Sequence, residues 1–296
     1  MKVQKSFAAA EGGRLYLVAT PIGNLQDMTL RALETLRQVD WIACEDTRRT
    51  RKLLSHYDIH TPFVSYHEHN QHKQGPRILG WLKEGKQVAL VSDAGTPLLS
   101  DPGEALVREA IAAGIPVVSI PGANAAVNAL IVSGLSAKRF TFLGFLPRQE
   151  QRMREELRRF RKTPETLVLY EAPHRLAQLA KAALDELGDR RVVLVRELTK
   201  RHEEVIRGTL AEIVAGLGEI DIRGEFTVLI EGGSEATEHG SADAEGEPVW
   251  STWDIAEHVA WYEGQGMSRM EAMKHAAKDR KLSKRDVYRL LHSGKL

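Results

Sequence analysis

The chain has 296 residues, 43% of them hydrophobic and 27% charged, which is ordinary for a globular enzyme of two domains with a small appendage. Its 41 Lys and Arg residues almost balance its 40 Asp and Glu residues, so the net charge gives no indication of a nucleic-acid partner. The single cysteine, Cys44, excludes an internal disulfide, and no long apolar run or signal-peptide pattern occurs, so we expect a cytoplasmic protein without a membrane segment.

The first two-thirds of the chain alternate short apolar runs with amphipathic segments. Buried strands are predicted at 15–19, 41–44, 88–91 and 117–120, each ending where Gly, Pro, Asp or Asn begins. Helices are predicted between and after them at 30–39, 47–56, 71–84, 104–113 and 125–132. Strands that alternate with helices indicate βαβ units, so we expect a mainly parallel sheet covered on both faces.

A second set of strands is predicted at 166–170, 191–196, 203–207 and 226–230. Some of the connections between them are short, which favours a mixed sheet with antiparallel pairs. We therefore expect an N-terminal α/β domain at 13–145 and a second α/β domain at 146–232, with a basic helix at 149–162 near its start.

The composition changes after the second domain. Residues 233–250 are rich in Gly, Ser, Ala and acidic residues and contain no Lys or Arg, which predicts an acidic flexible linker. Three short helices are then predicted at 251–264, 268–277 and 283–292, with Ser268 and Ser283 as N-caps. Residues 251–296 are therefore expected to form a helical, helix-turn-helix-like module.

Five loops follow predicted strands, at the strand ends where open α/β sheets bind their ligands. They lie at 20–24, 45–48, 92–97, 121–124 and 170–175. One such loop alone is better read as an ordinary turn, whereas five in matching positions favour a binding site. Neither G-x-G-x-x-G nor G-x-x-x-x-G-K-[ST] occurs, which disfavours NAD and ATP. His67, His69 and His72 have no cysteine partner, so no metal site is expected.

The motifs in these loops resemble those of a known family. In order, the chain contains Val-Ala-Thr-Pro-Ile-Gly-Asn at 18–24, Cys-Glu-Asp-Thr-Arg at 44–48, Ser-Asp-Ala-Gly-Thr-Pro at 92–97, Ser-Asp-Pro-Gly at 100–103, Pro-Gly at 121–122, Tyr-Glu at 170–171 and Arg-Glu-Leu-Thr-Lys at 196–200. Together they resemble the tetrapyrrole-methylase superfamily and, within it, the ribosomal RNA small subunit methyltransferase I family. The resemblance extends from 13 to 232, and the C-terminal helices are also similar to the family's tail.

The resemblance implies a class III methyltransferase fold, in which two α/β domains bind S-adenosylmethionine in the cleft between them. It also implies 2′-O-methylation of a cytidine in the decoding region of 16S ribosomal RNA, with the small ribosomal subunit as partner and a homodimer as the assembly. The tetrapyrrole enzymes tend to have Gly-Asp-Pro where this chain has Asp-Ala-Gly-Thr-Pro at 93–97, which favours the RNA branch. Carried over by position, the implied cofactor contacts are Pro21, Ser92, Asp93, Ala94, Gly95, Pro121, Gly122, Ala123, Tyr170 and Thr227.

Removal of the hydroxyl proton calls for a general base, which adds typically ~10²–10⁴-fold to a rate. The candidates are Glu45 and Asp46 after the second strand, and His67 in the run His67-Glu68-His69. Each has a structural alternative. A carboxylate at 45–46 caps the helix that starts at Thr47 and pairs with Arg48, and the histidine run forms a solvated loop. Glu197 either orients its strand end or contacts the ligand, and the residues alone leave the base unassigned.

Basic residues gather in three places on the otherwise neutral chain. Residues 148–162 contain seven Lys or Arg and three Glu, residues 267–296 contain nine Lys or Arg and three Asp or Glu, and a third cluster lies at 48–52. One cluster alone is more often a solvated face, but three favour phosphate contacts. The expected RNA contacts are Arg48, Arg49, Arg152, Arg158, Arg159, Lys284 and Arg285.

Three functions are compatible with this sequence. The first is a ribosomal RNA ribose methyltransferase, the second a small-molecule methyltransferase of the tetrapyrrole type, and the third a non-catalytic RNA-binding or assembly factor that keeps the fold. The basic C-terminal helices favour the first, because a tetrapyrrole enzyme has no evident use for them.

Overall fold

The computed structural model describes residues 3, 4, 6, 12–233, 253–264, 267–280 and 282–292. Contacts between Cα atoms divide the chain into two units, Met1–Glu235 and Ala236–Leu296, and each is described by itself. The acidic linker expected at 233–250 lies outside the described residues except for Gly233, and so do the side chains of Lys284 and His292.

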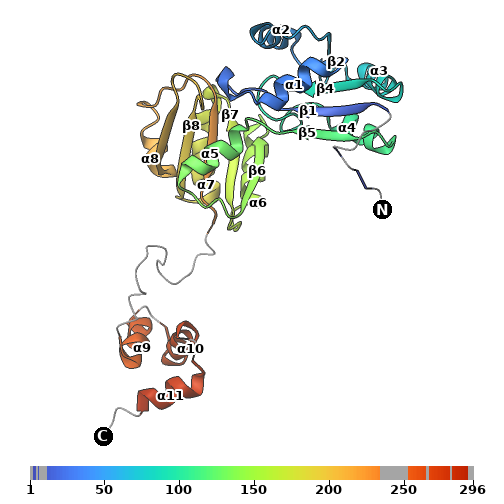
Figure 1. The fold of residues 1–296 in the computed structure, drawn as a ribbon. Coiled ribbons are helices and arrows are strands. Elements are labelled where there is room, and N and C mark those ends of the chain that lie inside the picture. The colour runs from blue at the N-terminus through green and yellow to red at the C-terminus, as the bar shows by residue number, and fades with distance from the viewer. Residues whose placement is uncertain are drawn as a thin grey trace. The chain divides into compact units, whose positions relative to one another are not determined.

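The first sheet is parallel throughout. Its strands are β1 (Arg14–Val18), β2 (Trp41–Cys44), β3 (Phe63–Ser65), β4 (Gln87–Val91) and β5 (Val117–Ile120), in the spatial order β3-β2-β4-β1-β5 (Figure 1). All four pairings are parallel, so the predicted parallel sheet is confirmed. Parallel neighbours need crossover connections, and the helices between these strands supply them.

Helices cover both faces of the first sheet. The helices α1 (Leu30–Gln38) and α2 (Thr47–His56) pack on one face, and α3 (Gln71–Lys83) and α4 (Glu104–Ala112) on the other. Side chains along a strand alternate between faces, so in β1 Val18 joins the first layer and Leu15 the second. The strands are mostly apolar because helices cover both faces of the sheet, and the polar residues Arg14 and Gln87 stand at strand starts.

The second sheet is mixed, as predicted. Its strands are β6 (Phe140–Phe145), β7 (Thr166–Glu171), β8 (Arg191–Arg196), β9 (Glu204–Thr209) and β10 (Phe226–Ile230), in the order β6-β7-β10-β8-β9. Only β6 and β7 run parallel, and the other three pairings are antiparallel. The helices α6 (Glu150–Arg159), α7 (Leu176–Leu187) and α8 (Leu210–Ala215) cover one face, and two short 3-10 turns lie at Leu25–Asp27 and Pro173–Arg175.

The opposite face of the second sheet is covered by α5 (Ala125–Ser133). Ala126, Ala129 and Leu130 of this helix are buried against Val168 and Val193. The chain therefore passes from the first sheet to the second between β5 and α5, whereas the sequence predicts the domain boundary after residue 145. The apolar, small-residue face of α5 gives the reason, because it fits the flat surface of the second sheet.

The second unit contains three helices among its described residues: α9 (Ile255–Gly264), α10 (Arg269–Asp279) and α11 (Lys284–His292). Their common core includes Val259, Tyr262, Ala276 and Val287. Ser268 is the N-cap of α10 in a capping box with Glu271, which confirms the predicted cap. Over the described part of the chain, no helix has the length and apolar character that a membrane span requires.

Candidate active site

The carboxyl ends of the parallel strands lie side by side. Val91 at the end of β4 is in register with Val18 of β1 and with Cys44 of β2. The loops that follow these strands therefore meet at one edge of the first sheet, where α/β proteins bind ligands. Two backbone hydrogen bonds link them directly, from Thr20 N to Gly95 O at 2.9 Å and from Gly95 N to Thr20 O at 3.0 Å.

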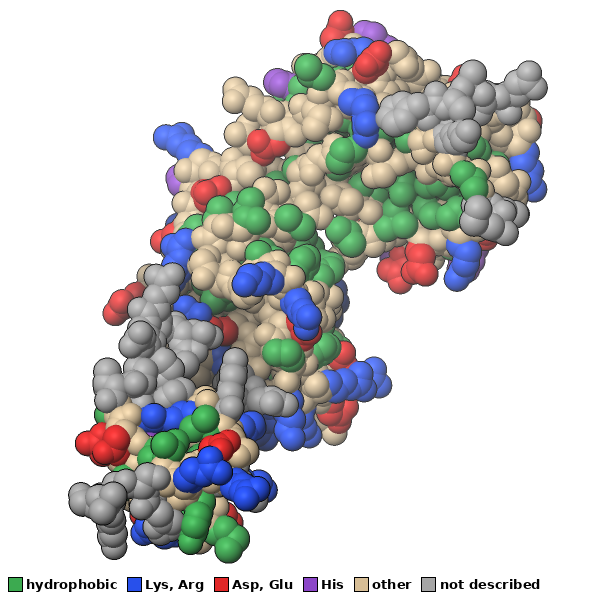
Figure 2. Space-filling model, turned by 60° about the horizontal axis from the view of Figure 1, so that its bottom comes forward, with side chains coloured by type: hydrophobic (Ala, Val, Ile, Leu, Met, Phe, Trp, Pro, Cys, Tyr) green, Lys and Arg blue, Asp and Glu red, His purple; other side chains and the backbone are tan. Residues whose placement is uncertain are grey.

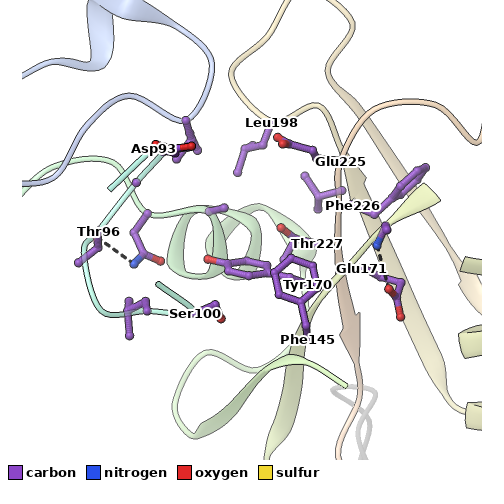
Figure 3. A pocket seen from close by; sticks show the side chains of 18 of the residues that line it. Asp93, Thr96, Ser100, Phe145, Tyr170, Glu171, Leu198, Glu225, Phe226 and Thr227 are labelled. Atoms are coloured by element: carbon purple, nitrogen blue, oxygen red, sulfur yellow. Dashed lines mark hydrogen bonds between the residues drawn. The ribbon is translucent and has the colours of Figure 1, made fainter. Parts of the chain in front are cut away.

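A cavity of about 370 Å³ lies between these loops and the second sheet (Figure 3). Residues 93–96 and 99–101 form one wall, and Tyr170, Phe226 and Thr227 belong to the opposite one. The structure brings five of the ten expected cofactor contacts into this lining: Asp93, Ala94, Gly95, Tyr170 and Thr227. Two chain segments far apart in the sequence thus share one site, and the Tyr170 hydroxyl accepts a hydrogen bond from Ala126 N at 3.2 Å.

The other five expected contacts lie around this lining. Pro21 and Ser92 line a second hollow of about 290 Å³, which shares Asp93 with the cavity. Pro121, Gly122 and Ala123 belong to neither described lining. The Ala123 carbonyl instead accepts a hydrogen bond from Thr96 Oγ1 at 3.2 Å and so supports the wall from behind.

The loop after β4 is held by buried hydroxyl groups. Ser92 Oγ donates to Gly95 O at 3.0 Å, and Thr20 Oγ1 donates to Ser92 O at 3.2 Å. Gly95 has a φ of +82°, which favours glycine, but Leu98 and Ser100 adopt φ values of +73° and +66° with side chains. Such conformations cost roughly 1–3 kcal/mol each and gather at functional sites. The loop therefore has a strained shape that its surroundings maintain.

The loops of the two sheets also touch. A Cβ atom at Gly23, after β1, would lie 2.3 Å from Lys200 Cγ, after β8, so only glycine permits this approach. Lys200 Nζ is itself bound by Glu197 Oε1 at 2.8 Å and by Glu225 Oε2 at 2.9 Å. Glu197 Oε1 also accepts a hydrogen bond from Glu225 N at 3.0 Å, so this carboxylate joins the loop after β8 to the residue that precedes β10.

The cavity is negatively charged. Its described lining contains the carboxyl groups of Asp93, Asp101, Glu171 and Glu225 and one cationic side chain, Lys200, which is already paired. Such a lining favours a cationic ligand over a polyphosphate. Burial, together with the nearby charges of Glu45 and Asp93, raises the pKa of Asp101 to about 7. Burial also raises the pKa of Glu171, whose Oε1 accepts a hydrogen bond from Ala172 N.

The three expected general-base candidates lie outside the described lining of the cavity. Asp46 is the N-cap of α2: its Oδ1 accepts from Arg48 N at 2.8 Å, and its Oδ2 pairs with the Arg48 guanidinium at 2.9 Å. These bonds lower the pKa of Asp46 to about 2, and they show the helix cap that was one of the two readings of this residue. Burial raises the pKa of Glu45, which lies close enough to Asp93 and His67 to feel their charges.

Asp101 is the carboxylate that the sequence analysis did not single out. It belongs to the motif Ser-Asp-Pro-Gly at 100–103, four residues beyond the Thr-Pro of the cofactor loop. Its signal was an acidic residue between loop-forming residues just after a candidate ligand loop. Among the described residues, no group of three or more His, Cys, Asp or Glu side chains is arranged to hold a metal ion.

The basic residues expected to contact RNA differ in their partners. Arg49 lines the second hollow with Lys52, and its Nε lies 3.7 Å from Asp93 Oδ2. Arg48 is paired with Asp46. Arg152 and Arg285 are exposed. Arg159 pairs with Glu156 at 2.7 Å. Lysine and arginine side chains are interspersed with acidic ones on the face in Figure 2, without a continuous basic surface.

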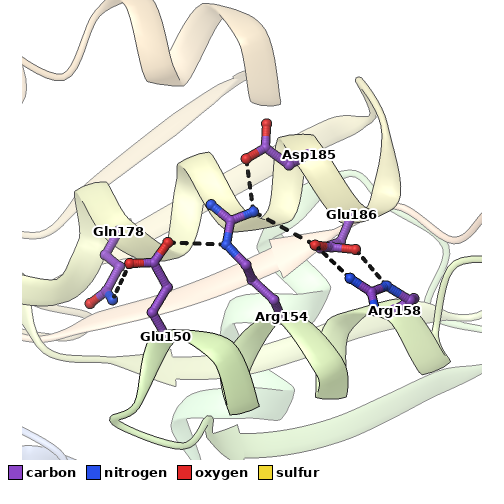
Figure 4. A network of polar contacts seen from close by, with 6 residues as sticks. All are labelled: Glu150, Arg154, Arg158, Gln178, Asp185 and Glu186. Carbon is purple, nitrogen blue, oxygen red and sulfur yellow. Dashed lines mark hydrogen bonds and ion pairs between the residues drawn. The ribbon is translucent and has the colours of Figure 1, made fainter.

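The charges of α6 are largely matched by α7 (Figure 4). Arg154 contacts Glu150 at 3.0 Å and Asp185 at 2.8 Å, and Arg158 contacts Glu186 at 2.9 Å. The positive excess of residues 148–162 therefore serves in part to join two helices that pack on the second sheet.

Comparison with known proteins finds a matching family and several relatives of this chain. Residues 14–214 match the model of the family described as Tetrapyrrole (Corrin/Porphyrin) Methylases. The chain is 49% identical over 293 residues to "Ribosomal RNA small subunit methyltransferase I" of Bacillus subtilis (strain 168), covering 99% of each chain. It is 44% identical over 279 residues to the protein of the same name from a Synechocystis species, covering 94% of this chain and 97% of the relative.

Two solved structures share the fold at lower identity. A uroporphyrin-III-C-methyltransferase from Thermus thermophilus aligns with a TM-score of 0.52 and 24% identity, over 74% of this chain and 94% of its own. A diphthine synthase aligns with a TM-score of 0.58 and 16% identity, over 74% of this chain and 89% of its own. At these identities the likeness concerns the fold alone.

Proposed function

This chain belongs to the ribosomal RNA small subunit methyltransferase I family of the tetrapyrrole methylases, and from that premise we propose that it methylates the 2′-oxygen of a cytidine in the decoding region of 16S ribosomal RNA. The proposed methyl donor is S-adenosylmethionine. The observation that carries the proposal is the acidic cavity at the carboxyl edge of the first sheet, in a chain that matches its relatives over nearly its whole length.

The residues of the cavity fit S-adenosylmethionine. That molecule carries a sulfonium and an ammonium group against one carboxylate, so its net positive charge suits a lining with four carboxyl groups and one paired lysine. Ile22, Leu198 and Phe226 supply apolar surface for the adenine ring. We assign the methionine part to residues 93–96 and the adenosine part to Tyr170 and Thr227. When bound, the donor supplies a methyl group activated by the positive charge on sulfur.

The chain itself contributes orientation. The loop after β4 is held by hydrogen bonds of the Ser92 and Thr20 hydroxyl groups, and the Tyr170 hydroxyl accepts one from Ala126 N in α5, so both walls of the cavity have internal supports. Holding two reactants in line supplies up to roughly 7–11 kcal/mol of a barrier in favourable cases.

The RNA contacts are assigned to cations at the second hollow, on α6 and on the C-terminal unit. Arg49 and Lys52 line the hollow that shares Asp93 with the cavity, and they would meet the phosphates beside the target nucleotide. Arg152 and Arg285 are exposed and suited to more distant phosphates. We further propose that the protein acts as a homodimer in the cytoplasm, where the small ribosomal subunit is assembled. Sedimentation of the full chain with and without subunits tests the dimer.

The decisive experiment uses the full chain, methyl-labelled S-adenosylmethionine and small ribosomal subunits that lack the modification. The expected product is 2′-O-methylcytidine, identified by mass spectrometry of the digested rRNA. A 2′-O-methyl group also makes the adjacent phosphodiester resistant to alkali, whereas base methylation does not. Label in a nucleobase contradicts the ribose as acceptor. Label only in an added porphyrinoid supports a small-molecule enzyme, and no transfer supports an assembly factor.

A further inference from the structure

The loop between β8 and β9 lies where the cavity meets the second hollow. Leu198 and Lys200 belong to the cavity lining, and the Lys200 side chain packs against Gly23, which lines the second hollow. Figure 3 shows Leu198 and Asp93 on opposite sides of the cavity, and Asp93 is the residue that both linings share. This loop of the second sheet therefore borders both spaces.

Hydrogen bonds hold the loop in a defined shape. Thr199 has a φ of +67°, a value that residues with side chains keep only where their surroundings maintain it. Its backbone nitrogen donates to the Glu203 carboxylate, and Glu203 N donates to Lys200 O at 3.1 Å. The second of these bonds closes a β-turn whose two central residues are Arg201 and His202. Both residues are exposed at the tip of this turn.

The loop presents positive charge to its surroundings, because its acidic groups are engaged within the protein. The engaged groups and their partners are Glu197 with Lys200, Glu203 with Thr199 N, and Glu204 with Arg196. Within the described part of the chain, no hydrogen bond or ion pair is made by the Arg201 guanidinium. This guanidinium is therefore available to an anion outside the protein.

An RNA strand that enters this site must approach an acidic cavity. The carboxyl groups of the lining repel its phosphates, so cations at the border are needed to hold the strand. Arg49 and Lys52 of α2 line the second hollow, and Arg201 directly follows Lys200, which packs beside the same hollow. Cations from two different sheets thus border one space. A guanidinium can bind a phosphate through two parallel hydrogen bonds, which fixes orientation as well as adding affinity.

On the basis of the proposed function, we propose that Arg201 binds a phosphate of the substrate RNA close to the methylated nucleotide, while Arg49 and Lys52 bind the same strand at the second hollow. Arg201 would act in substrate binding and take no part in methyl transfer itself. The residue lies outside the three basic clusters of the sequence, and Glu203 and Glu204 follow it closely. Its charge points outward only because the fold gives those glutamates other partners.

The first test measures the affinity of the full chain for small ribosomal subunits over a range of salt concentrations. Arg201→Ala is expected to weaken binding about tenfold at low salt, the order expected for one hydrogen bond between charged groups. The slope of log affinity against log salt is expected to fall by about 1. Arg201→Lys keeps the charge and is expected to keep the slope. An Arg201→Ala slope equal to that of the wild type overturns the proposal.

Arg139→Ala is the matched control for this test. Arg139 is exposed like Arg201, but it precedes β6, whose opposite end at Phe145 lines the cavity. Its removal is expected to leave the affinity and the salt slope close to those of the wild type. A loss as large as that of Arg201→Ala would show a general effect of charge and would contradict a contact at the loop.

The second test locates the contact on the RNA. Cys44 is the single cysteine of the chain and is buried, so Arg201→Cys can carry one photoreactive group at the tip of the turn. Irradiation of the complex with small subunits is expected to cross-link this position to nucleotides within a few positions of the methylated one. Arg139→Cys with the same group is expected to leave that stretch of rRNA unmodified. Cross-links from position 201 only to distant rRNA or to ribosomal proteins contradict the proposal.

Kinetics separates binding from chemistry. Arg201→Ala is expected to raise the KM for small subunits about tenfold, and to leave the single-turnover rate at saturating subunits within a few-fold of the wild type. The Kd for S-adenosylmethionine, measured by calorimetry, is expected to be unchanged, which also verifies that the variant is folded. A lower rate at saturation with an unchanged KM, or a weakened cofactor affinity, contradicts a role in RNA binding alone.

The two proposals fail in different ways. If the wild-type chain transfers no methyl group to rRNA, the proposed function is wrong. If the wild type transfers the group and Arg201→Ala has the same KM and salt slope, the function stands and Arg201 is not a phosphate contact. If the wild type binds subunits without methyl transfer and Arg201→Ala weakens that binding, the contact stands and the proposed activity falls.

Discussion

The Oδ1 atom of Asp93 accepts a hydrogen bond of 2.9 Å from the backbone nitrogen of Asp46. This bond joins the loop after β4 to the start of α2. The carboxylates of Asp46 and Asp93 nevertheless have different partners. Asp46 turns its own side chain back to cap α2 and to bind Arg48. The Asp93 carboxyl group lies at the border between the cavity and the second hollow and lines both.

The Asp93→Asn substitution removes the charge of this side chain and keeps an oxygen atom that can accept its hydrogen bond. The amide oxygen still accepts from Asp46 N, so the loop keeps its shape, but the attraction for a cationic ligand is reduced. We expect the Kd for S-adenosylmethionine to rise about tenfold, equivalent to about 1.4 kcal/mol, and Asp93→Ala to weaken it further. Calorimetry gives the values. Asp58→Asn is the control, since Asp58 is exposed and its carboxylate pairs with the exposed His60, and an equal loss there refutes the assignment.

Gly95→Ala tests whether the backbone of the loop forms the cofactor site. Gly95 and Gly114 have φ values of +82° and +77°, and an alanine costs roughly 1–2 kcal/mol of stability at either position. Only at Gly95 does the added Cβ meet the cavity, 3.2 Å from Ile22 Cγ2, whereas Gly114 faces open space. We expect similar melting temperatures for the two variants and a weakened S-adenosylmethionine affinity for Gly95→Ala alone. Equal affinities in both variants contradict the assigned site.

Arg49→Ala and Arg158→Ala separate RNA contact from structural pairing. The slope of log affinity against log salt is expected to fall by about 1 when a phosphate contact is removed. Arg49 is exposed beside the second hollow, so its removal is expected to reduce that slope. Arg158 is bound by Glu186, so its removal is expected to loosen α6 from α7 and leave the slope unchanged. Titration of small ribosomal subunits or model RNA with each variant over a range of salt concentrations measures this slope.

The lowered pKa of Asp46 predicts that the free energy of unfolding decreases in acid. Hydrogen bonds from Arg48 lower the pKa of this group from 3.8 to about 2 in the folded chain. A group with a lowered folded pKa stabilises the protein above its unfolded pKa, and that contribution disappears as the pH falls from 3.8 toward 2. The wild type is therefore expected to be more stable than Asp46→Asn at neutral pH and equal to it at the acid end. Urea unfolding across this range measures the difference, and a constant difference would contradict the assigned cap.

The sequence patterns predicted most of the sheet strands because burial leaves a clear local signal. The apolar runs at 41–44, 117–120, 191–196 and 226–230 coincide with β2, β5, β8 and β10. β3 and β6 lack such a signal, since β3 has three residues at a sheet edge and β6 is partly exposed and interrupted by a bulge between Phe142 and Gly144. The helix α7 does carry a local signal in the sequence, with Leu176, Leu179, Ala180, Ala183 and Leu187 at helical spacing on a buried face.

The loops of the candidate site could be predicted from the sequence, whereas the ionisation of its carboxyl groups could not. By itself the sequence determined most of the strands, the two kinds of sheet, and the loops after β1, β4 and β7 that carry the family's motifs. The spacing of hydrophobic residues and the positions of Gly and Pro are local features, so they are visible in the sequence itself. Only the tertiary structure decided that Asp46 caps a helix while Asp101 faces the cavity. The ionisation of a carboxyl group depends on burial and on charges within several ångströms, and Glu45, Asp93 and Asp101 become neighbours only when β2 and β4 pair.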